Sequence, residues 1–362
     1  MHYLLFTIVV SFFVSCFARE TSSNIFSADG NSHTKIETNS EDPQNEKQRG
    51  VHVFGRMDSN AMAPLIRSNF EWVTFVPYAG MKDYNSSSIR IFRGDADRRR
   101  RRDSMWRSNV KLVHSHGLKV FLKPHIWIGE ATDGKWRSDI YPETEEDWIN
   151  WSADYREFIM HYAEIAELTD VDMFCVGTEL TALTLKKPQF WEDLIRDVKK
   201  VYSGQLTYAA NWYKEYDGIT FWDQLDYIGI QAYFPLSKNE NATVSDISNG
   251  WQSHLHKIEA VHKRFDKKIL FTEMGYKSTN DSAIKPWEWM DYSKANQEKL
   301  SVQTQANCYQ AFFDSVWNQD WFAGVHIWQW RSHYDKSGGE DDTDFTPQRK
   351  LAESVIAEGF AH

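Results

Sequence analysis

The sequence has few cysteines and lacks the common motifs for metals and nucleotides. Only 3 of its 362 residues are Cys, and Cys175 and Cys308 lie far apart, so they predict neither a disulfide framework nor a CxxC site. The HExxH zinc helix, the P-loop and the GxSxG elbow are absent. His125 and His326 could bind a metal, but no third ligand accompanies them. We therefore expect no metal site and no cofactor.

Positive charge and long apolar segments are also scarce. A net charge of −10 disfavours binding to nucleic acid or to an anionic membrane. The uncharged segment 3–18 is too short for a transmembrane span and is typical of a secretory signal within residues 1–18. Two processing routes stay open, cleavage after Ala18 or lipidation of Cys16 as a membrane anchor. We expect a protein, secreted or lipid-anchored at the cell surface or periplasm, that is monomeric.

Aromatic residues, by contrast, are abundant. They make up 15% of the chain, including 16 Trp. Aromatic rings fill protein cores, but they also stack on the apolar faces of sugar rings. Two of them, Trp287 and Trp289, belong to segment 280–294, a loop long enough to form one wall of a cleft.

From residue 50 onward, strand patterns alternate with helical patterns. Residues 19–49 are polar and predict a disordered tether, which leaves 50–362 as the folded domain. Such strict alternation predicts an α/β fold, a single (β/α)8 TIM barrel. A doubly wound open sheet is the rival, but the glycine-rich turn that usually follows its first strand is missing. The expected strands are 51–56, 71–78, 118–127, 173–179, 205–212, 227–234, 269–275 and 322–330, and the expected helices are 98–116, 145–167, 188–201, 250–264 and 295–317.

Two of these strands end in a glutamate, Glu179 in FCVGTEL and Glu273 in ILFTEMGY. Parallel barrels present their functional groups at the carboxyl ends of the strands. Two carboxyl groups brought together there could cleave a glycosidic bond, one as acid and the other as nucleophile. The alternative is a pair of surface glutamates that stabilise helix N-termini. The residues predicted to point inward by alternation are Met173, Cys175, Gly177 and Glu179 on one strand and Ile269, Phe271 and Glu273 on the other.

Polar and aromatic residues at the ends of other strands strengthen the glycosidase hypothesis. The Tyr233 hydroxyl could keep a nucleophilic carboxylate ionised by hydrogen bonding, and Gln231 shares its face. The predicted sugar-binding residues are Lys123, His125, Trp127, Thr178, Asn211, Trp212, Gln231, Trp328 and Trp330, with His326 on the face of the last two. The run Arg98 to Arg102 goes round a helix, which favours a solvated helix start over a site for an anionic partner.

The strings KPHIW, FCVGTEL and ILFTEMGY, with a tryptophan-rich eighth strand, resemble glycoside hydrolase family 113. The resemblance covers residues 50–358 and implies a retaining (β/α)8 enzyme that cleaves β-1,4-mannan internally by double displacement. It implies Glu179 as the acid/base and Glu273 as the nucleophile. One departure is Thr178, which stands where much of the wider clan has an Asn that binds the sugar 2-hydroxyl. Thr178 or Asn211 would take that role, or the hydroxyl is recognised differently.

Three alternatives to a mannanase stay open at this point. The chain could be another β-glycosidase of the clan, such as a glucanase or xylanase. It could be a non-catalytic glycan-binding lipoprotein that kept the cleft, or a barrel with no sugar partner.

Overall fold

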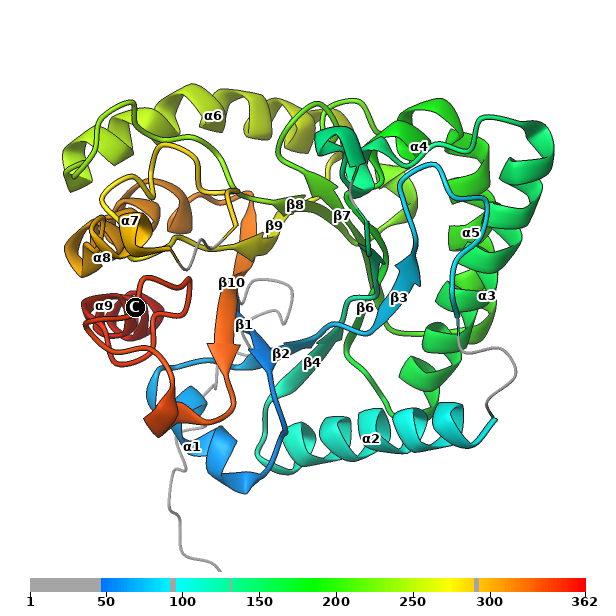
Figure 1. Cartoon of the computed structure of the whole chain (residues 1–362), viewed down its shortest axis with the longest axis horizontal. Coiled ribbons are helices and arrows are strands. Elements are labelled where there is room, and N and C mark those ends of the chain that lie inside the picture. Colours follow the sequence, from blue (N-terminus) through cyan, green and yellow to red (C-terminus); the bar gives the residue numbers. More distant parts are fainter. Residues whose placement is uncertain (1–46, 92–95, 131, 290–292) are drawn as a thin grey trace, which may run out of the picture. The chain divides into compact units, whose positions relative to one another are not determined.

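The computed structural model describes residues 47–91, 96–130, 132–289 and 293–362. Eight parallel strands within them close into a barrel in the order β1-β10-β9-β8-β7-β6-β4-β2, which confirms the predicted TIM barrel (Figure 1). A small second sheet pairs β3 with β5. The strands are β1 (Gln48–Phe54), β2 (Trp72–Phe75), β3 (Tyr78–Met81), β4 (Lys119–Leu122), β5 (His125–Ile128), β6 (Met173–Thr178), β7 (Gln205–Asn211), β8 (Tyr227–Gln231), β9 (Ile269–Met274) and β10 (Phe322–Arg331).

Helices surround the barrel, as Figure 1 shows. The helix expected over 145–167 is present as α3, and it packs on the barrel through Trp151, Tyr155, Ile159 and Tyr162, which are all fully or almost fully buried. The α-helices are α1 (Ser59–Arg67), α2 (Ala96–Ser115), α3 (Glu145–Leu168), α4 (Thr181–Lys186), α5 (Pro188–Val201), α6 (Val244–Phe265), α7 (Lys294–Gln297), α8 (Val302–Phe312) and α9 (Leu351–Phe360).

Several boundaries differ from the predictions, and three of the differences have a local cause. The strand expected over 118–127 splits at Pro124, which cannot donate a backbone hydrogen bond, and β5 leaves the barrel to pair with β3. Helix α6 begins six residues early, at Val244, because Thr243 and Asp246 form a capping box there. The helix expected over 295–317 is interrupted before Ser301, whose side chain caps α8. The helix α9 was not predicted.

The N-terminal predictions fall largely outside the described residues. Residues 1–46, with Cys16, Ala18 and most of the expected tether, are among those that the structure does not describe. The tether was expected to reach residue 49, but β1 already begins at Gln48 and pairs with β10. In the described ranges no helix combines the length and the apolar character that crossing a membrane requires.

The interior of the barrel is a layer of apolar side chains below the strand ends. It contains Trp72, Phe121, Met173, Cys175, Ala209, Leu270 and Ala323. The inner face of β9 therefore carries Leu270 rather than the predicted Ile269 and Phe271. Phe271 instead packs against Trp251 and Phe312 of the outer helices.

Strict alternation thus fails on β9, and register shifts in the strand pairing set the side-chain directions of both glutamates. The pairing of β8 with β9 skips one residue between Phe271 and Glu273, and such a bulge re-aims the side chains that follow it. On β6 the pairing shifts between Cys175 and Thr178. Gly177 faces outward, because a Cβ there would lie within 3 Å of Tyr155 of α3 and of Trp191 of α5. The predicted inward faces were thus wrong for Gly177, Ile269 and Phe271, since strict alternation ignores bulges.

Candidate active site

Glu273 lies at the end of β9 and is bound by three donors. Its Oε2 accepts hydrogen bonds from Lys123 Nζ at 2.7 Å and from Gln231 Nε2 at 2.8 Å. Its Oε1 accepts a hydrogen bond from the Tyr233 hydroxyl. The carboxyl is almost buried, with 6% of the residue exposed. Both carboxyl oxygens of Glu273 are therefore held in place by hydrogen bonds.

Lys123 and Gln231 hold each other in place. Lys123 Nζ also donates to Gln231 Oε1 at 3.1 Å and to the carbonyl of Thr272 at 3.0 Å. Thr272 Oγ1 donates to the same Gln231 oxygen, which fixes the amide orientation. Burial lowers the pKa of Lys123, and the charge of Glu273 opposes that shift. All three ammonium protons are used, so the prediction that Lys123 binds sugar gives way to a role in holding Glu273.

Glu179 follows β6 with a φ of 52°, an unusual backbone conformation for a residue with a side chain. Its Oε2 lies 3.2 Å from Arg137 Nε in an ion pair that is about 90% buried. Burial raises the pKa of Glu179, Arg137 opposes this shift, and the charge of Glu273 adds to it. Glu179 therefore holds a proton more readily than an exposed glutamate would.

Two buried histidines stay neutral beside these carboxyls. Arg137 Nη1 donates to His125 Nδ1 at 3.0 Å, so the ring proton of His125 is on Nε2. His52 Nδ1 bonds to the carbonyl of Ile327, and its Nε2 lies 3.9 Å from Glu273 Oε2. Burial lowers the pKa of both rings well below the usual value, and the Lys123 charge adds to this. The contact between His52 and Glu273 is therefore not an ion pair.

A third carboxyl, Glu215, lies fully buried behind the site. It accepts hydrogen bonds from the hydroxyls of Tyr208, Thr181 and Thr184 and from the backbone N–H of Asn211 at 2.6 Å. Burial raises the pKa of Glu215 to about 7, although these donors oppose the shift. The carboxyl thus joins the end of β7 to the segment that follows Glu179.

Aromatic side chains form walls above the strand ends. Trp127, Trp136 and Trp289 contact one another edge to face, with ring centroids 5.6–6.1 Å apart. Trp212 packs against Trp287 at 5.0 Å. Trp127, Trp287 and Trp289 are all more than 40% exposed. Trp287 and Trp289 of the segment 280–294 therefore pack beside Trp212 and Trp127, and exposed rings of this kind can stack on sugars.

The tryptophans of β10 do not share a role. Trp328 contacts His52 and Phe54 at the barrel opening. Trp330 is 1% exposed and packs between Phe70 and Tyr334 on the outer side, so its prediction as a sugar-binding residue is wrong. The pairing of β1 with β10 is irregular between Ile327 and Trp330, which breaks the alternation.

His326 lies deep in the barrel and is fully buried. Its two ring nitrogens bond to Thr74 Oγ1 at 2.6 Å and to Gln48 Oε1 at 2.9 Å. Both nitrogens are thus used within the protein, and the role of His326 is structural. Among the described residues there is no cluster of three His, Cys, Asp or Glu side chains that could hold a metal.

Thr178 and Asn211, the two candidates for the 2-hydroxyl contact, lie at the ends of neighbouring strands. Thr178 is 2% exposed, and its hydroxyl is 3.5 Å from the carbonyl of Pro124. Asn211 is half-buried, and its Oδ1 accepts a hydrogen bond from the N–H of Tyr213. That bond orients the Asn211 side chain, and its NH2 group donates no hydrogen bond within the described part of the chain.

Sequence reasoning missed His52, Arg137 and Glu215. A signal existed for His52, which is a polar residue within the apolar run Val51 to Val53 of β1. Arg137 begins a three-residue 3-10 helix (Arg137–Asp139) and Glu215 lies in the connection after β7, and neither is long enough for periodicity to show which way a side chain points. Only the fold shows that they reach the strand ends.

Comparisons with known proteins agree with this geometry. The sequence model of Glycoside Hydrolase Family 113 matches residues 48–350. A structure described as a complex of a GH113 β-1,4-mannanase is 27% identical with a TM-score of 0.72, covering 87% of this chain and 99% of that one. The GH113 β-mannanase AaManA from Alicyclobacillus acidocaldarius, in complex with ManMIm, is 26% identical with the same TM-score and covers 87% and 97%.

More distant structures share the fold alone. Faecalibacterium prausnitzii β-glucuronidase is 13% identical with a TM-score of 0.55, covering 87% of this chain and 49% of that one. Comparison with curated protein sequences gives no match.

Proposed function

The chain belongs to glycoside hydrolase family 113, and we propose that it cleaves β-1,4-linked mannan by a retaining double displacement. The observation that carries this mechanism is the contrast between two buried carboxyls. Glu273 accepts hydrogen bonds from three donors, whereas burial and the Glu273 charge raise the pKa of Glu179. When the environments of two carboxyl groups push their pKa values apart, the group with the raised pKa acts as the acid and the other acts as the base or nucleophile.

In the first step the ionised Glu273 attacks the anomeric carbon, and Glu179 donates its proton to the departing oxygen. A covalent glycosyl ester forms on Glu273, which removes its negative charge. The pKa of Glu179 then falls, because the like charge that raised it is gone. Glu179 can now accept a proton from the water that hydrolyses the ester. Retention requires the two carboxyls to lie about 5–5.5 Å apart, a separation that stays a prediction.

Mannan is proposed as the substrate because GH113 structures that this chain resembles are described as β-mannanases. The exposed rings of Trp127, Trp289 and Trp287 offer stacking surfaces for several sugar units along a chain. This supports internal cleavage of a polysaccharide. We also propose export of the chain, on the basis of its N-terminal segment 1–18.

Rescue by azide tests the roles of the two carboxyls. Glu273→Ala should not turn over manno-oligosaccharides bearing a good leaving group, and added azide should yield an α-glycosyl azide by direct displacement. Glu179→Ala with azide should instead give the β-product, since the covalent step on Glu273 is intact. Wild-type activity in Glu273→Ala would refute the assignment.

A polysaccharide panel tests the substrate. Release of reducing ends from mannan, but not from β-glucan or xylan, is expected. Faster cleavage of xylan or β-glucan would point to another β-glycosidase, and binding to mannan without any product would point to a glycan-binding protein.

A further inference from the structure

A large cavity opens beside the candidate active site, between β1 and the small β3–β5 sheet. Its volume is about 700 Å3, within the usual range of about 300–1,000 Å3 for ligand sites. Phe54, Tyr78 and Trp127 provide aromatic walls. The rings of Tyr78 and Trp127 lie 6.2 Å apart, and both are more than a third exposed. A sugar-sized ligand would therefore find stacking surfaces here.

On one side, a series of side-chain contacts connects the cavity lining to Glu179. The Tyr78 ring lies 5.7 Å from the ring of His125. His125 is bonded to Arg137, which pairs with Glu179.

On the other side, a second series of side-chain contacts connects the lining to Glu273. Phe54 packs on Trp328 at 4.9 Å, and Trp328 packs on His52 at 5.2 Å. His52 in turn lies 3.9 Å from Glu273. A glycan cleaved between the two carboxyls would thus have its neighbouring sugars or branches within reach of the cavity.

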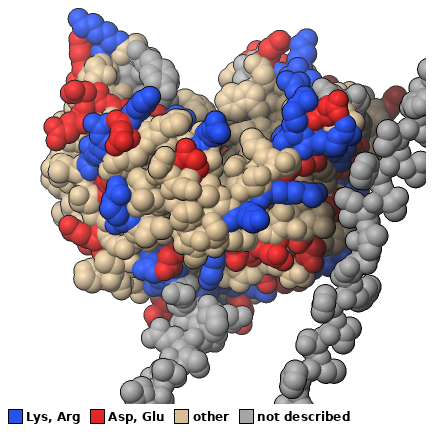
Figure 2. All heavy atoms as spheres, turned by 90° about the horizontal axis from the view of Figure 1, so that it is seen from below, with Lys and Arg blue, Asp and Glu red and all other residues tan. Residues whose placement is uncertain are grey.

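The charge of the lining is positive. Arg90 and Arg98 line the cavity, and no acidic residue does so among the described residues, although the whole chain carries −10. The backbone of Arg90 is fixed by two hydrogen bonds with Gly80 of β3. Lys and Arg side chains gather on the side where the N-terminal end of α2 lies (Figure 2). A guanidinium beside aromatic rings suits an anionic group on a ring-shaped ligand.

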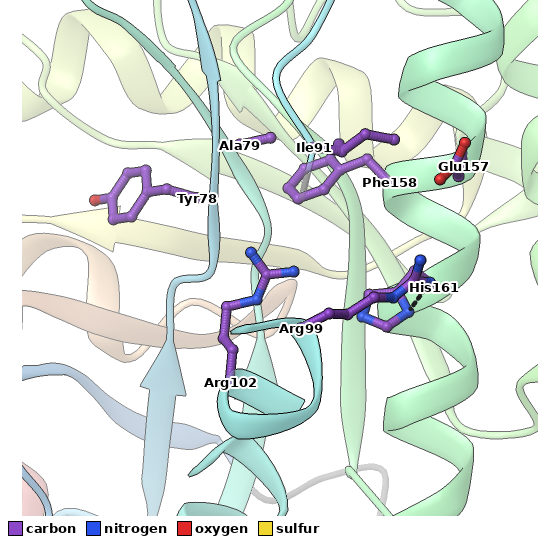
Figure 3. A pocket seen from close by; sticks show the side chains of 8 residues that line it. All are labelled: Tyr78, Ala79, Ile91, Arg99, Arg102, Glu157, Phe158 and His161. Carbon is purple, nitrogen blue, oxygen red and sulfur yellow. Dashed lines mark hydrogen bonds between the residues drawn. The ribbon is translucent and has the colours of Figure 1, made fainter. Parts of the chain in front are cut away.

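A smaller cavity beneath, of about 20 Å3, separates this site from the helices and has room for about one water. Figure 3 shows that Tyr78 points away from Phe158 there, and that Arg99 turns toward His161 of α3. Arg99 Nη2 bonds to His161 Nδ1 at 2.8 Å. Arg99 is therefore engaged with α3, whereas Arg90 lines the larger cavity.

We propose that this cavity, referred to here as the Arg90 cavity, binds an oxyanion on a sugar of the glycan substrate, either a uronic acid carboxylate or a sulfate ester. The inference rests on the proposed glycosidase function and gives the substrate an acidic decoration. The guanidinium of Arg90 pairs with the oxyanion, and Tyr78 and Trp127 contact the ring that carries it.

The test compares matched oligosaccharides. β-1,4-manno-oligosaccharides with a uronic acid branch, with a sulfate ester, and with the same uronic acid reduced to its alcohol are each titrated into Glu179→Gln protein and hydrolysed by the wild type. The wild type should prefer one acidic ligand over the reduced one at low salt. In Arg90→Gln that preference should fall about tenfold, the loss expected for one charge-assisted hydrogen bond. Added salt should weaken it as well.

Arg101→Gln is the matched control, because Arg101 is exposed on the same helix as Arg98 and does not line the cavity. It should keep the full preference. A preference for the uronic acid or for the sulfate ester identifies the oxyanion. Equal binding of acidic and reduced ligands, or an acidic preference that survives Arg90→Gln, would overturn the proposal. If neutral mannan is hydrolysed without any acidic preference, the Arg90 cavity proposal fails alone; if no glycan is bound or hydrolysed, both proposals fail.

Discussion

The Nζ of Lys123 lies 2.7 Å from the Oε2 of Glu273, although 150 residues separate them in the chain. Lys123 is fully buried, and its ammonium group also donates hydrogen bonds to Gln231 and to the carbonyl of Thr272. The ammonium group therefore offsets the charge of a carboxylate that water scarcely reaches. Neither group would be tolerated there alone, because an unpaired buried charge is costly.

Replacing Lys123 with Met should thus harm both stability and catalysis. Breaking one partner of a buried pair costs about 3–5 kcal/mol of unfolding free energy. Turnover should fall roughly 100-fold, as when a preorganised donor is removed. Urea denaturation and steady-state kinetics measure the two effects. Lys135→Met, which removes an exposed pair with Asp139, should cost no more than about 0.5 kcal/mol; equal losses in both variants would contradict this account.

Arg137 should set the basic limb of the activity profile. Its charge lowers the pKa of Glu179, which burial and Glu273 raise. The acid must be protonated, so activity is lost as the pH rises through the pKa of Glu179. Arg137→Gln removes the opposing charge, so the basic limb of kcat/KM should move to higher pH. Measured pH profiles of the variant and of Lys135→Met test this, and an unmoved limb in Arg137→Gln would refute it.

Glu215 should act as a positioning residue for Glu179. Its partner Tyr208 accepts a hydrogen bond from the N–H of Leu180, directly after Glu179. Glu215→Gln replaces one acceptor oxygen with a donor, and the backbone N–H of Asn211 cannot reverse to accept. We expect kcat to fall roughly tenfold with little change in KM. A rise in KM with unchanged kcat would argue instead for a role in substrate binding. Glu167→Gln, at an exposed site, is the control.

Glu215 also makes stability depend on pH. Its pKa is about 7 in the folded protein and 4.5 in the reference state. The folded state therefore binds the proton more tightly, so its contribution is greatest below the unfolded pKa and is lost as the pH rises toward 7. Between about pH 5 and pH 8, the stability of the wild type relative to Glu215→Gln should fall by roughly 2 kcal/mol. Denaturation curves for both proteins at the two pH values provide the measurement, and a constant difference would show that Glu215 does not titrate in this range.

Two tryptophans should respond in opposite ways. Trp330→Ala should cost about 3–5 kcal/mol of stability, since the ring is buried against Phe70 and Tyr334. Trp127 is 44% exposed, so Trp127→Ala should leave stability nearly unchanged and weaken binding of manno-oligosaccharides by loss of stacking. Calorimetric titration and thermal unfolding separate the two effects. Weaker ligand binding in a folded Trp330→Ala protein would instead support the prediction from the sequence that Trp330 binds sugar.

The barrel and its two glutamates could be predicted from the sequence, because both depend on local patterns. Apolar runs such as Met173 to Val176 mark buried strands, and a carboxyl at the end of such a run is conspicuous. The same local rule failed for Gly177 and Phe271, where register shifts break the alternation. A bulge depends on the neighbouring strand, and the strand's own residues do not reveal it.

The sequence by itself determined which chemical groups are available and at which end of the barrel they lie. Only the tertiary structure decided their partners: Lys123 for Glu273, Arg137 for Glu179, and Glu215 behind both β6 and β7. The physical reason is that periodicity fixes the direction of a side chain over a few residues. A hydrogen bond between distant residues instead requires the barrel to close and bring strand ends and loops together.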